Sequence, residues 1–284
     1  MKTGLIMEGG GMRGLYTAGV IDVLLENEIT FDAAIGVSAG AAFGCNFKSK
    51  QHGRPLRYNL NYCKDPRYNS IRSLIKTGDL FGAEFCYKTL PFELDIWDQE
   101  TYQNNPMDFY VVCSDIESGK PVYIKCNNGD EKDIQWIRAS SSLPLVSRVV
   151  EIDGGKYLDG GIADSIPIEA FEKMGYRHNL VILTQPAGYV KGKNPTIPLL
   201  KLKMGKYPNF IKTMAERHIV YNHQLQAVAE AKAKGRAFVI QPSKPLEVGR
   251  ADKNPKNLQA AYDLGRADAL SKITELKEFL AKAK

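Results

Sequence analysis

The chain has 284 residues, of which 44 % are hydrophobic and 25 % charged, and its formal net charge is +6. This length and composition are ordinary for a globular protein with a sizeable core. Basic residues are interspersed with acidic ones and form no long patch with aromatics, which argues against nucleic-acid binding. The apolar runs are too short for a membrane span, and the N-terminal one is too short for a signal peptide. We therefore expect a cytoplasmic protein.

Cysteine usage points the same way. The five cysteines are scattered, odd in number and without Cys-x-x-Cys spacing. Neither a disulfide framework nor a zinc site is indicated. We expect reduced thiols and no bound metal.

The first element is a short apolar strand, Leu5-Ile6-Met7, which runs into Glu-Gly-Gly-Gly-Met-Arg-Gly at residues 8–14. Apolar residues then keep helical spacing from 15 to 25. Three consecutive glycines leave backbone N–H groups uncovered at the start of that helix, which suits a negatively charged oxygen. Either a transient oxyanion or a phosphate fits this description.

A second strand, residues 33–35, runs into Gly36-Val37-Ser38-Ala39-Gly40. Gly-x-Ser-x-Gly after a strand is the pattern of a nucleophile elbow, in which flanking glycines let the backbone turn sharply and expose the serine hydroxyl. Ser38 is therefore a candidate nucleophile. The small apolar residues from 39 to 47 predict a buried helix beneath it.

The first glycine turn has a competing interpretation. Gly9, Gly11 and Gly14 also satisfy the Gly-x-Gly-x-x-Gly pattern of a dinucleotide site. That site requires an acidic residue at the end of the second strand, yet Asp32 precedes this strand and Ser38 occupies its end. A nucleotide-binding protein that uses residues 9–14 stays as the alternative function.

The middle of the chain is less regular. Residues 51–105 predict short helices and loops that cover the site. Residues 108–115 and 121–124 predict a hairpin at the sheet edge. A short helix over 133–140 ends in the small-residue loop Ala-Ser-Ser-Ser-Leu-Pro at 139–144.

A third glycine turn, Asp159-Gly160-Gly161, follows two short strands at 149–152 and 156–158 and precedes a helix near Pro167. An aspartate at a strand end, followed by two glycines, can approach another backbone closely. Taken alone, the triplet is more typical of a plain Asp-Gly hairpin turn.

The remaining residues predict a buried parallel strand at 179–184, a helix at 210–234 with Ile219 among its core positions, a strand at 237–240, and a helix from Lys256 broken near Gly265. Residues 201–207 mix basic and apolar side chains, which suits an anionic lipid surface, although a solvated face is more usual. Alternating strands and helices favour an α/β sheet with helices on both faces, in one domain over residues 1–284.

A serine nucleophile needs a base, usually histidine. The four histidines are His52, His178, His218 and His223. None follows a strand in an obvious active-site loop, although the order Ser38, Asp159, then a later histidine would suit a hydrolase triad.

Four of these features occur together and in order: the 8–14 turn, the 36–40 elbow, the 139–144 loop and the Asp159 triplet. In this combination the chain resembles the patatin-like phospholipase family over residues 4 to about 170. The resemblance implies a three-layer α/β sandwich with a mostly parallel central sheet flanked by helices. It leaves residues 178–284 as a C-terminal strand and helix portion without an interpretable motif.

The resemblance also implies a Ser–Asp dyad without histidine, with Ser38 as nucleophile and Asp159 as its activating residue. Asp153 lies in a similar Asp-Gly-Gly triplet, but the family pattern places the catalytic triplet directly before the Ile-Pro helix. Oxyanion donors would be N–H groups among Gly10, Gly11 and Met12, with Ala39 by analogy to other elbows. Arg13 would add positive charge near this hole or anchor the turn.

The implied function is hydrolysis of lipid carboxyl esters, of phospholipase A, lysophospholipase or esterase type, without cofactor or metal. The implied partner is a lipid or other acyl-ester substrate, with peripheral contact at a membrane compatible with the 201–207 run. Nothing in the sequence indicates an oligomeric state.

Overall fold

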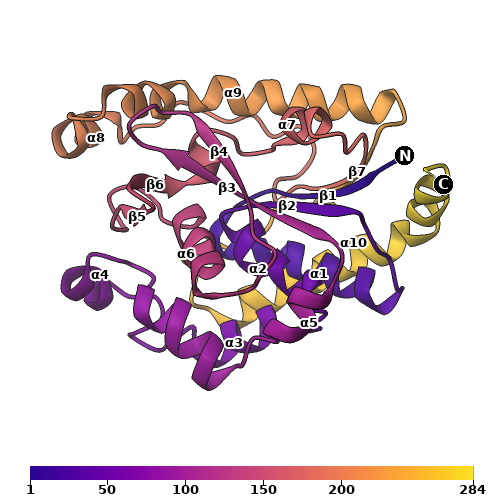
Figure 1. Ribbon diagram of the computed structural model, residues 1–284, viewed down its shortest axis with the longest axis horizontal. Helices are drawn as coiled ribbons and strands as arrows, with labels where there is room; N and C mark the ends of the chain where they lie inside the picture. The colour runs from indigo at the N-terminus through magenta and orange to yellow at the C-terminus, as the bar shows by residue number, and fades with distance from the viewer. Residues whose placement is uncertain (284) are drawn as a thin grey trace.

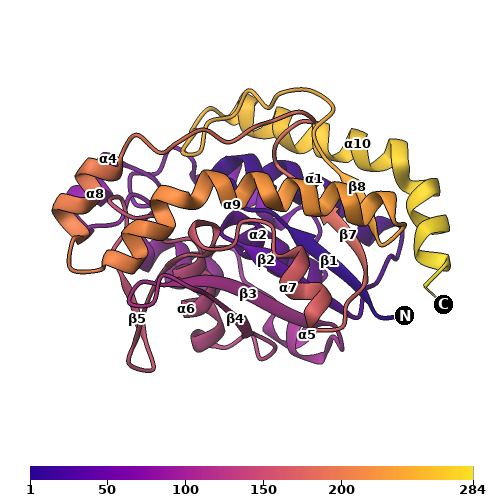
Figure 2. The same cartoon turned by 90° about the horizontal axis from the view of Figure 1, so that it is seen from above.

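The computed structural model describes residues 1–283, in which one eight-stranded sheet lies between two layers of helices (Figure 1 and Figure 2). The strand order is β5-β6-β3-β2-β1-β7-β8, and β4 pairs with β3. The strands are Thr3–Met7 (β1), Ala33–Val37 (β2), Asp108–Asp115 (β3), Pro121–Lys125 (β4), Val150–Ile152 (β5), Gly155–Asp159 (β6), His178–Ile182 (β7) and Ala237–Ile240 (β8).

The helices divide between the two faces of the sheet. In Figure 1, α7 and α9 lie above it, and α1, α2, α6 and α10 lie below. The α-helices are Gly14–Glu26 (α1), Ala39–Lys48 (α2), Arg54–Tyr62 (α3), Ile71–Thr77 (α4), Gln99–Asn104 (α5), Glu131–Ser140 (α6), Ile168–Lys173 (α7), Ile197–Met204 (α8), Pro208–Ala233 (α9) and Pro255–Ala281 (α10). Shorter turns are η1 (Gly11–Arg13), the π-helix η2 (Phe85–Leu94) and η3 (Gly160–Ile162).

The sheet is mostly parallel. Strands β3, β2, β1, β7 and β8 run parallel to one another, while β4 and β6 pair antiparallel with β3 and β5 with β6. Successive residues of β1 point to opposite faces, so Leu5 and Met7 pack with α1 and α2, and Ile6 packs beneath α7 and α9. Burial on both faces is the reason these strands read as continuous apolar runs. The predicted α/β sandwich is confirmed.

Two predictions about the C-terminal helices were wrong. Helix α10 continues through Gly265, because this glycine lets α10 cross α1 closely: a Cβ there would lie 2.0 Å from the Tyr16 carbonyl oxygen. Gly19 of α1 makes the reciprocal approach, 2.1 Å from the Tyr262 carbonyl oxygen. The cost of glycine within a helix is offset here by packing. Ile219 of α9 is not in the core but is 61 % exposed, since it lies off the buried stripe that includes Met214 and Tyr221.

Candidate active site

Strand β3 brings the ends of two other strands together. Its partner β4 pairs along 110–114, so β2 and β6 must both lie on the opposite edge, β2 along 108–112 and β6 along 113–115. Val37, the last residue of β2, faces Val112, and Asp159, the last residue of β6, faces the next residue, Cys113. The two strand ends therefore meet, although Ser38 and Asp159 are 121 residues apart in the chain.

Ser38 occupies a strained turn between β2 and α2. Its backbone has φ 55° and ψ −122°, a region that residues with a Cβ seldom occupy. The neighbouring glycines make the turn possible: a Cβ on Gly40 would lie 2.2 Å from the Met7 carbonyl oxygen, and one on Gly36 would lie 2.6 Å from Ala41 Cα. This is the geometry of a nucleophile elbow.

The side chains of Ser38 and Asp159 are hydrogen-bonded. Ser38 Oγ donates to Asp159 Oδ2 at 2.6 Å, and the Gly161 N–H donates to Asp159 Oδ1 at 2.8 Å. The carboxylate is held at both oxygens and is 2 % exposed. The structure thus brings together the two residues of the predicted dyad, whose catalytic roles stay a prediction.

The small-residue loop at 139–144 positions both Ser38 and Asp159. The sequence shows this loop as a motif but does not predict its contacts. The Ser38 N–H donates to Ser140 Oγ at 2.8 Å, and Ser140 Oγ donates to the Val112 carbonyl oxygen at 2.6 Å. The Asp159 N–H donates to the Ser142 carbonyl oxygen at 2.8 Å. The serine-rich composition of the loop could have predicted these contacts, because short serine side chains readily hydrogen-bond to nearby backbone groups.

Burial raises the pKa of the Asp159 carboxyl above its ordinary value, although hydrogen bonds from Ser38 and Gly161 and the charge of Arg217 act in the opposite direction. A carboxylate with a raised pKa is a better base toward a serine hydroxyl than an exposed one.

The glycine turn at residues 9–11 lies directly beside the elbow, since a Cβ on Gly9 would lie 2.8 Å from Ser38 Cβ. Across residues 1–283, the N–H groups of Gly10, Gly11 and Ala39 have no intramolecular acceptor. The Met12 N–H differs, because it donates to the Arg250 carbonyl oxygen at 3.0 Å. Of the four predicted oxyanion donors, Gly10, Gly11 and Ala39 are therefore the ones free to serve.

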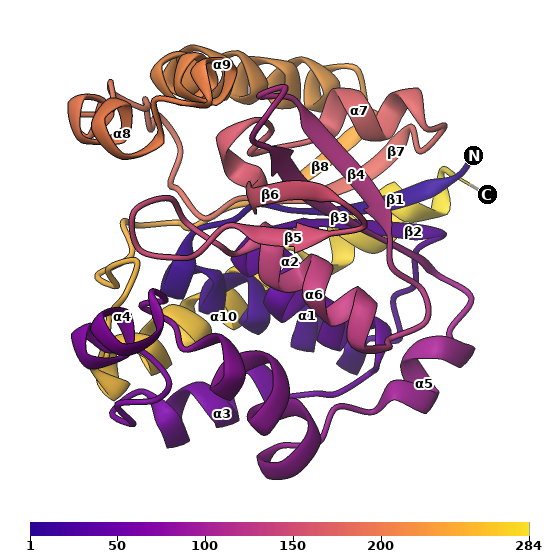
Figure 3. The ribbon, with the colours of Figure 1, turned by 60° about the vertical axis from the view of Figure 1, so that its left-hand side comes forward.

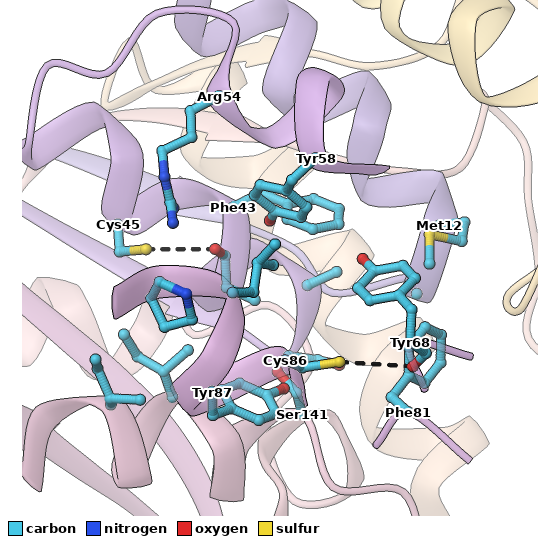
Figure 4. A pocket seen from close by; sticks show the side chains of 18 of the residues that line it. Met12, Phe43, Cys45, Arg54, Tyr58, Tyr68, Phe81, Cys86, Tyr87 and Ser141 are labelled. Carbon is cyan, nitrogen blue, oxygen red and sulfur yellow. Dashed lines mark hydrogen bonds between the residues drawn. The ribbon is translucent and has the colours of Figure 1, made fainter. Parts of the chain in front are cut away.

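An apolar cavity of about 130 Å³ opens at Ser38 on one side (Figure 4). It reaches between α2, α3, α6 and η2, of which α3 and η2 belong to the irregular region, residues 51–105, that was predicted to cover the site. Aromatic and aliphatic side chains line most of it, among them Phe43, Tyr58, Tyr68, Phe81, Leu90 and Ile137. The cavity is suited to an apolar chain.

A smaller, polar cavity of about 40 Å³ lies on another side of Ser38 and Asp159. Four basic residues line it: Arg13, Lys191, Arg217 and Arg250. The last three lie in the C-terminal portion and belong to no motif, so the sequence could not have predicted that they meet here. Arg13 faces this cavity, and its Nε is buried without a hydrogen-bond partner in the described part of the chain.

The other candidate residues lie elsewhere. Asp153 is in the exposed β5–β6 turn and forms an ion pair with Lys132 at 2.7 Å. Within residues 1–283, neither cavity at Ser38 is lined by a histidine. His178, for example, stacks on Phe279 in α10 with ring centroids 3.7 Å apart.

The nucleotide alternative finds no support in this geometry. Asp32 precedes β2, and its carboxylate accepts a hydrogen bond from the Thr3 N–H at 2.7 Å, at the end of the sheet opposite to the glycine turn. It cannot contact a ribose bound beside Gly9, Gly11 and Gly14.

Comparison with known proteins identifies the family. The model of the patatin-like phospholipase family matches residues 5–172, so the chain belongs to that family. A second family model, a domain of unknown function (DUF6363), matches residues 207–281. The family match contains the elbow, the glycine turn and Asp159, and the second match contains α9 and α10.

Individual relatives are distant. The uncharacterized protein YjjU of Escherichia coli K12 is 27 % identical over 93 % of this chain and 75 % of its own length. Lysophospholipase NTE1 of Candida albicans is 24 % identical over 95 % of this chain, which spans only 19 % of NTE1. VipD from Legionella pneumophila has a solved structure that aligns with a TM-score of 0.48 and 12 % identity, over 96 % of this chain and 67 % of that one.

The raised pKa of Asp159 predicts an acid limit to activity. A base that takes the Ser38 proton must be ionised, so the predicted role of Asp159 implies that kcat/KM for a soluble ester falls on acidification at a pH above the ordinary carboxyl value of about 3.9. A pH–rate profile measures this, with circular dichroism at each pH to exclude unfolding. Activity that stays constant down to pH ~4 would contradict the expectation.

Proposed function

We propose that the protein is a serine acyl hydrolase that cleaves carboxyl esters of lipids through a Ser38–Asp159 dyad. The observation that carries the proposal is the 2.6 Å hydrogen bond from Ser38 Oγ to buried Asp159 Oδ2, at the mouth of an apolar cavity. Family membership supports the same reaction class. The whole chain acts as one unit in this proposal, because β8 and α10 complete the same sheet and helix layers as the family core.

In the proposed reaction, Ser38 Oγ attacks the ester carbonyl carbon as its proton passes to Asp159 Oδ2. The oxyanion that forms accepts hydrogen bonds from the N–H groups of Gly10, Gly11 and Ala39. Collapse of this intermediate releases the alcohol, which takes the proton from Asp159 and leaves an acyl-serine. Water then attacks the acyl-serine as Asp159 takes its proton, the bond from the acyl carbon to Ser38 Oγ breaks, and Oγ regains the proton from Asp159 as the carboxylic acid departs.

Substitution of the dyad tests this mechanism. We expect Ser38→Ala and Asp159→Asn each to lower kcat/KM for a long-chain ester by at least ~10³-fold, since the nucleophile and its base act as a unit. Asp153→Asn is the matched control and should keep wild-type activity, because Asp153 is exposed and distant from Ser38. Labelling by a fluorophosphonate probe should depend on Ser38. Full activity in Ser38→Ala would refute the proposal.

Stability measurements exclude a trivial cause for the loss. Because the folded-state pKa of Asp159 is raised, the stabilisation given by its protonated form is present at low pH and is lost as pH rises through that pKa. At neutral pH the buried charge therefore lowers the free energy of unfolding. Asp159→Asn should raise the Tm at neutral pH while it abolishes activity, whereas general misfolding would lower both.

The apolar cavity is proposed to hold the acyl chain. Ala42 of α2 lines it one turn beyond Ser38, so Ala42→Phe would fill part of its volume. We expect activity on long-chain p-nitrophenyl esters to fall about 10- to 100-fold relative to the acetate ester, since each excluded methylene forfeits ~0.8 kcal/mol of burial. Equal effects on all chain lengths would show that the chain binds elsewhere.

We further propose that the protein contacts lipid through α4 and α8. Both helices lie at the end of the molecule where the parallel strands have their carboxyl ends (Figure 1 and Figure 3). Helix α4 exposes two isoleucines, Ile71 at 71 % and Ile75 at 80 %. Helix α8 exposes Leu202 at 82 %, while its Leu200 is buried. Basic neighbours Arg72, Lys76, Lys201 and Lys203 are also exposed, which favours an anionic surface.

Vesicle binding tests this contact. Ile75→Glu and Leu202→Glu should each lower co-sedimentation with vesicles of phosphatidylglycerol at least ~10-fold, because each loses the burial of one aliphatic side chain. Ile219→Glu, at an exposed position on α9, should bind as the wild type does. Unchanged binding by both test variants would contradict a role for α4 and α8.

Among the helices of residues 1–283, none has the length and apolar composition that a membrane span requires.

A further inference from the structure

The polar cavity beside Ser38 carries an excess of positive charge. Its basic residues come from four separate segments: Arg13 from η1, Lys191 from the loop after β7, Arg217 from α9 and Arg250 from the loop before α10. The acidic residues that line it are Glu8 and Asp159. In the part of the chain that the structure describes, no ion pair includes any of the four basic residues.

The two carboxylates are committed to other partners. Glu8 Oε2 accepts from the Thr184 N–H at 2.7 Å, and Glu8 Oε1 accepts from the Tyr221 hydroxyl at 2.6 Å. Asp159 is bonded to Ser38 and Gly161. Arg217 Nε donates to the Gly161 carbonyl oxygen, which leaves its terminal nitrogens for the cavity. The four cations thus outnumber the two carboxylates, and although the charges of Asp159 and Glu8 favour their charged forms, none of them forms an ion pair within residues 1–283.

The positive charges of the basic residues lower one another's pKa values. Burial, together with the charges of Arg217 and Arg250, lowers the pKa of Lys191 to about 7. Burial, then the charge of Arg250, lowers the pKa of Arg13. Lys191 Nζ lies 4.1 Å from the Tyr221 ring centroid, which holds its ammonium without neutralising it. A bound anion would relieve this repulsion.

The polar and apolar cavities meet at the nucleophile. Both are lined by Gly11, Ser38, Leu143 and Arg250. An acyl chain in the apolar cavity would therefore place its ester carbonyl at Ser38 and direct the alcohol side of the ester toward the basic residues. In a glycerophospholipid with one acyl chain, that alcohol side bears the phosphate.

We propose that Lys191, Arg217 and Arg250 form a phosphate-binding subsite that selects lipids with a phosphate on the leaving alcohol, such as a monoacyl glycerol phosphate. This inference rests on the proposed lipid hydrolase function and deepens it. Arginine and lysine together suit a phosphate group, since the guanidinium fork binds two oxygens and the ammonium adds a compact charge. The C-terminal portion, which had no interpretable motif, thereby acquires a role in substrate choice.

The subsite predicts a selectivity that substitutions alter. The measured quantity is the ratio of kcat/KM for 1-oleoyl-glycerol 3-phosphate to that for 1-oleoyl-glycerol. Lys191→Gln and Arg250→Gln should each lower this ratio about 10- to 100-fold, because a hydrogen bond to a charged group is lost in a partly buried site. Lys212→Gln, on the same helix as Arg217 but exposed, is the matched control and should keep the ratio. An unchanged ratio in both test variants would overturn the proposal.

Binding of inorganic phosphate gives a readout that does not need catalysis. Phosphate should raise the Tm of Ser38→Ala protein, and Lys191→Gln in that background should abolish most of the shift. Phosphate should also inhibit hydrolysis of 1-oleoyl-glycerol competitively in the wild type. No shift with phosphate, or a shift that persists in Lys191→Gln, would count against the subsite.

The two measurements separate this inference from the proposed function. A protein that binds phosphate through Lys191 but hydrolyses no ester would refute the hydrolase and leave an anion site. A protein that hydrolyses 1-oleoyl-glycerol and binds no phosphate would retain the hydrolase and refute the subsite. Phosphate binding without preference for the phosphorylated substrate would mean that the site takes free phosphate and not the lipid head group, which also overturns the proposal.

Discussion

The pairing of β2 and β6 along one edge of β3 is the constraint on which the rest of the site depends. Consecutive residues Val112 and Cys113 face the last residues of those two strands, so β3 fixes the separation of Ser38 and Asp159 through backbone hydrogen bonds. The separation of the two side chains therefore depends on the backbone pairing more than on their rotamers, since the ends of β2 and β6 are aligned by β3. The Gly161 N–H then fixes the orientation of the Asp159 carboxylate toward Ser38.

The strained elbow shows how the surrounding packing supports that constraint. Ser38 keeps an unfavourable backbone conformation because Gly36 and Gly40 let α2 and β1 approach from both sides. Burial of Asp159 likewise costs stability at neutral pH and raises its pKa. Both costs are local to the turn at Ser38 and the end of β6, and the apolar layers above and below the sheet offset them.

The two cavities meet at Ser38 and differ in the part of the chain that lines them. The family core supplies most of the apolar wall, whereas three of the four cations of the polar wall follow residue 172, where the family match ends. Helix α9 contributes Arg217 and Tyr221, and the Arg250 carbonyl oxygen also secures the glycine turn through the Met12 N–H. The C-terminal portion thus contacts the glycine turn through a backbone hydrogen bond and also places positive charge beside it.

The sequence by itself determined the class of fold, the order of its strands and helices and the elbow at Ser38, because glycine spacing and apolar periodicity are local properties. The choice of Asp159 over Asp153 needed the family resemblance, and its catalytic role stays a prediction. Only the tertiary structure decided which N–H groups stay free, since Met12 is occupied by a residue 238 positions later. It also decided that Gly265 permits a helix crossing and not a break. The basic residues at 191, 217 and 250 share no spacing in the chain, so their meeting follows from the fold alone.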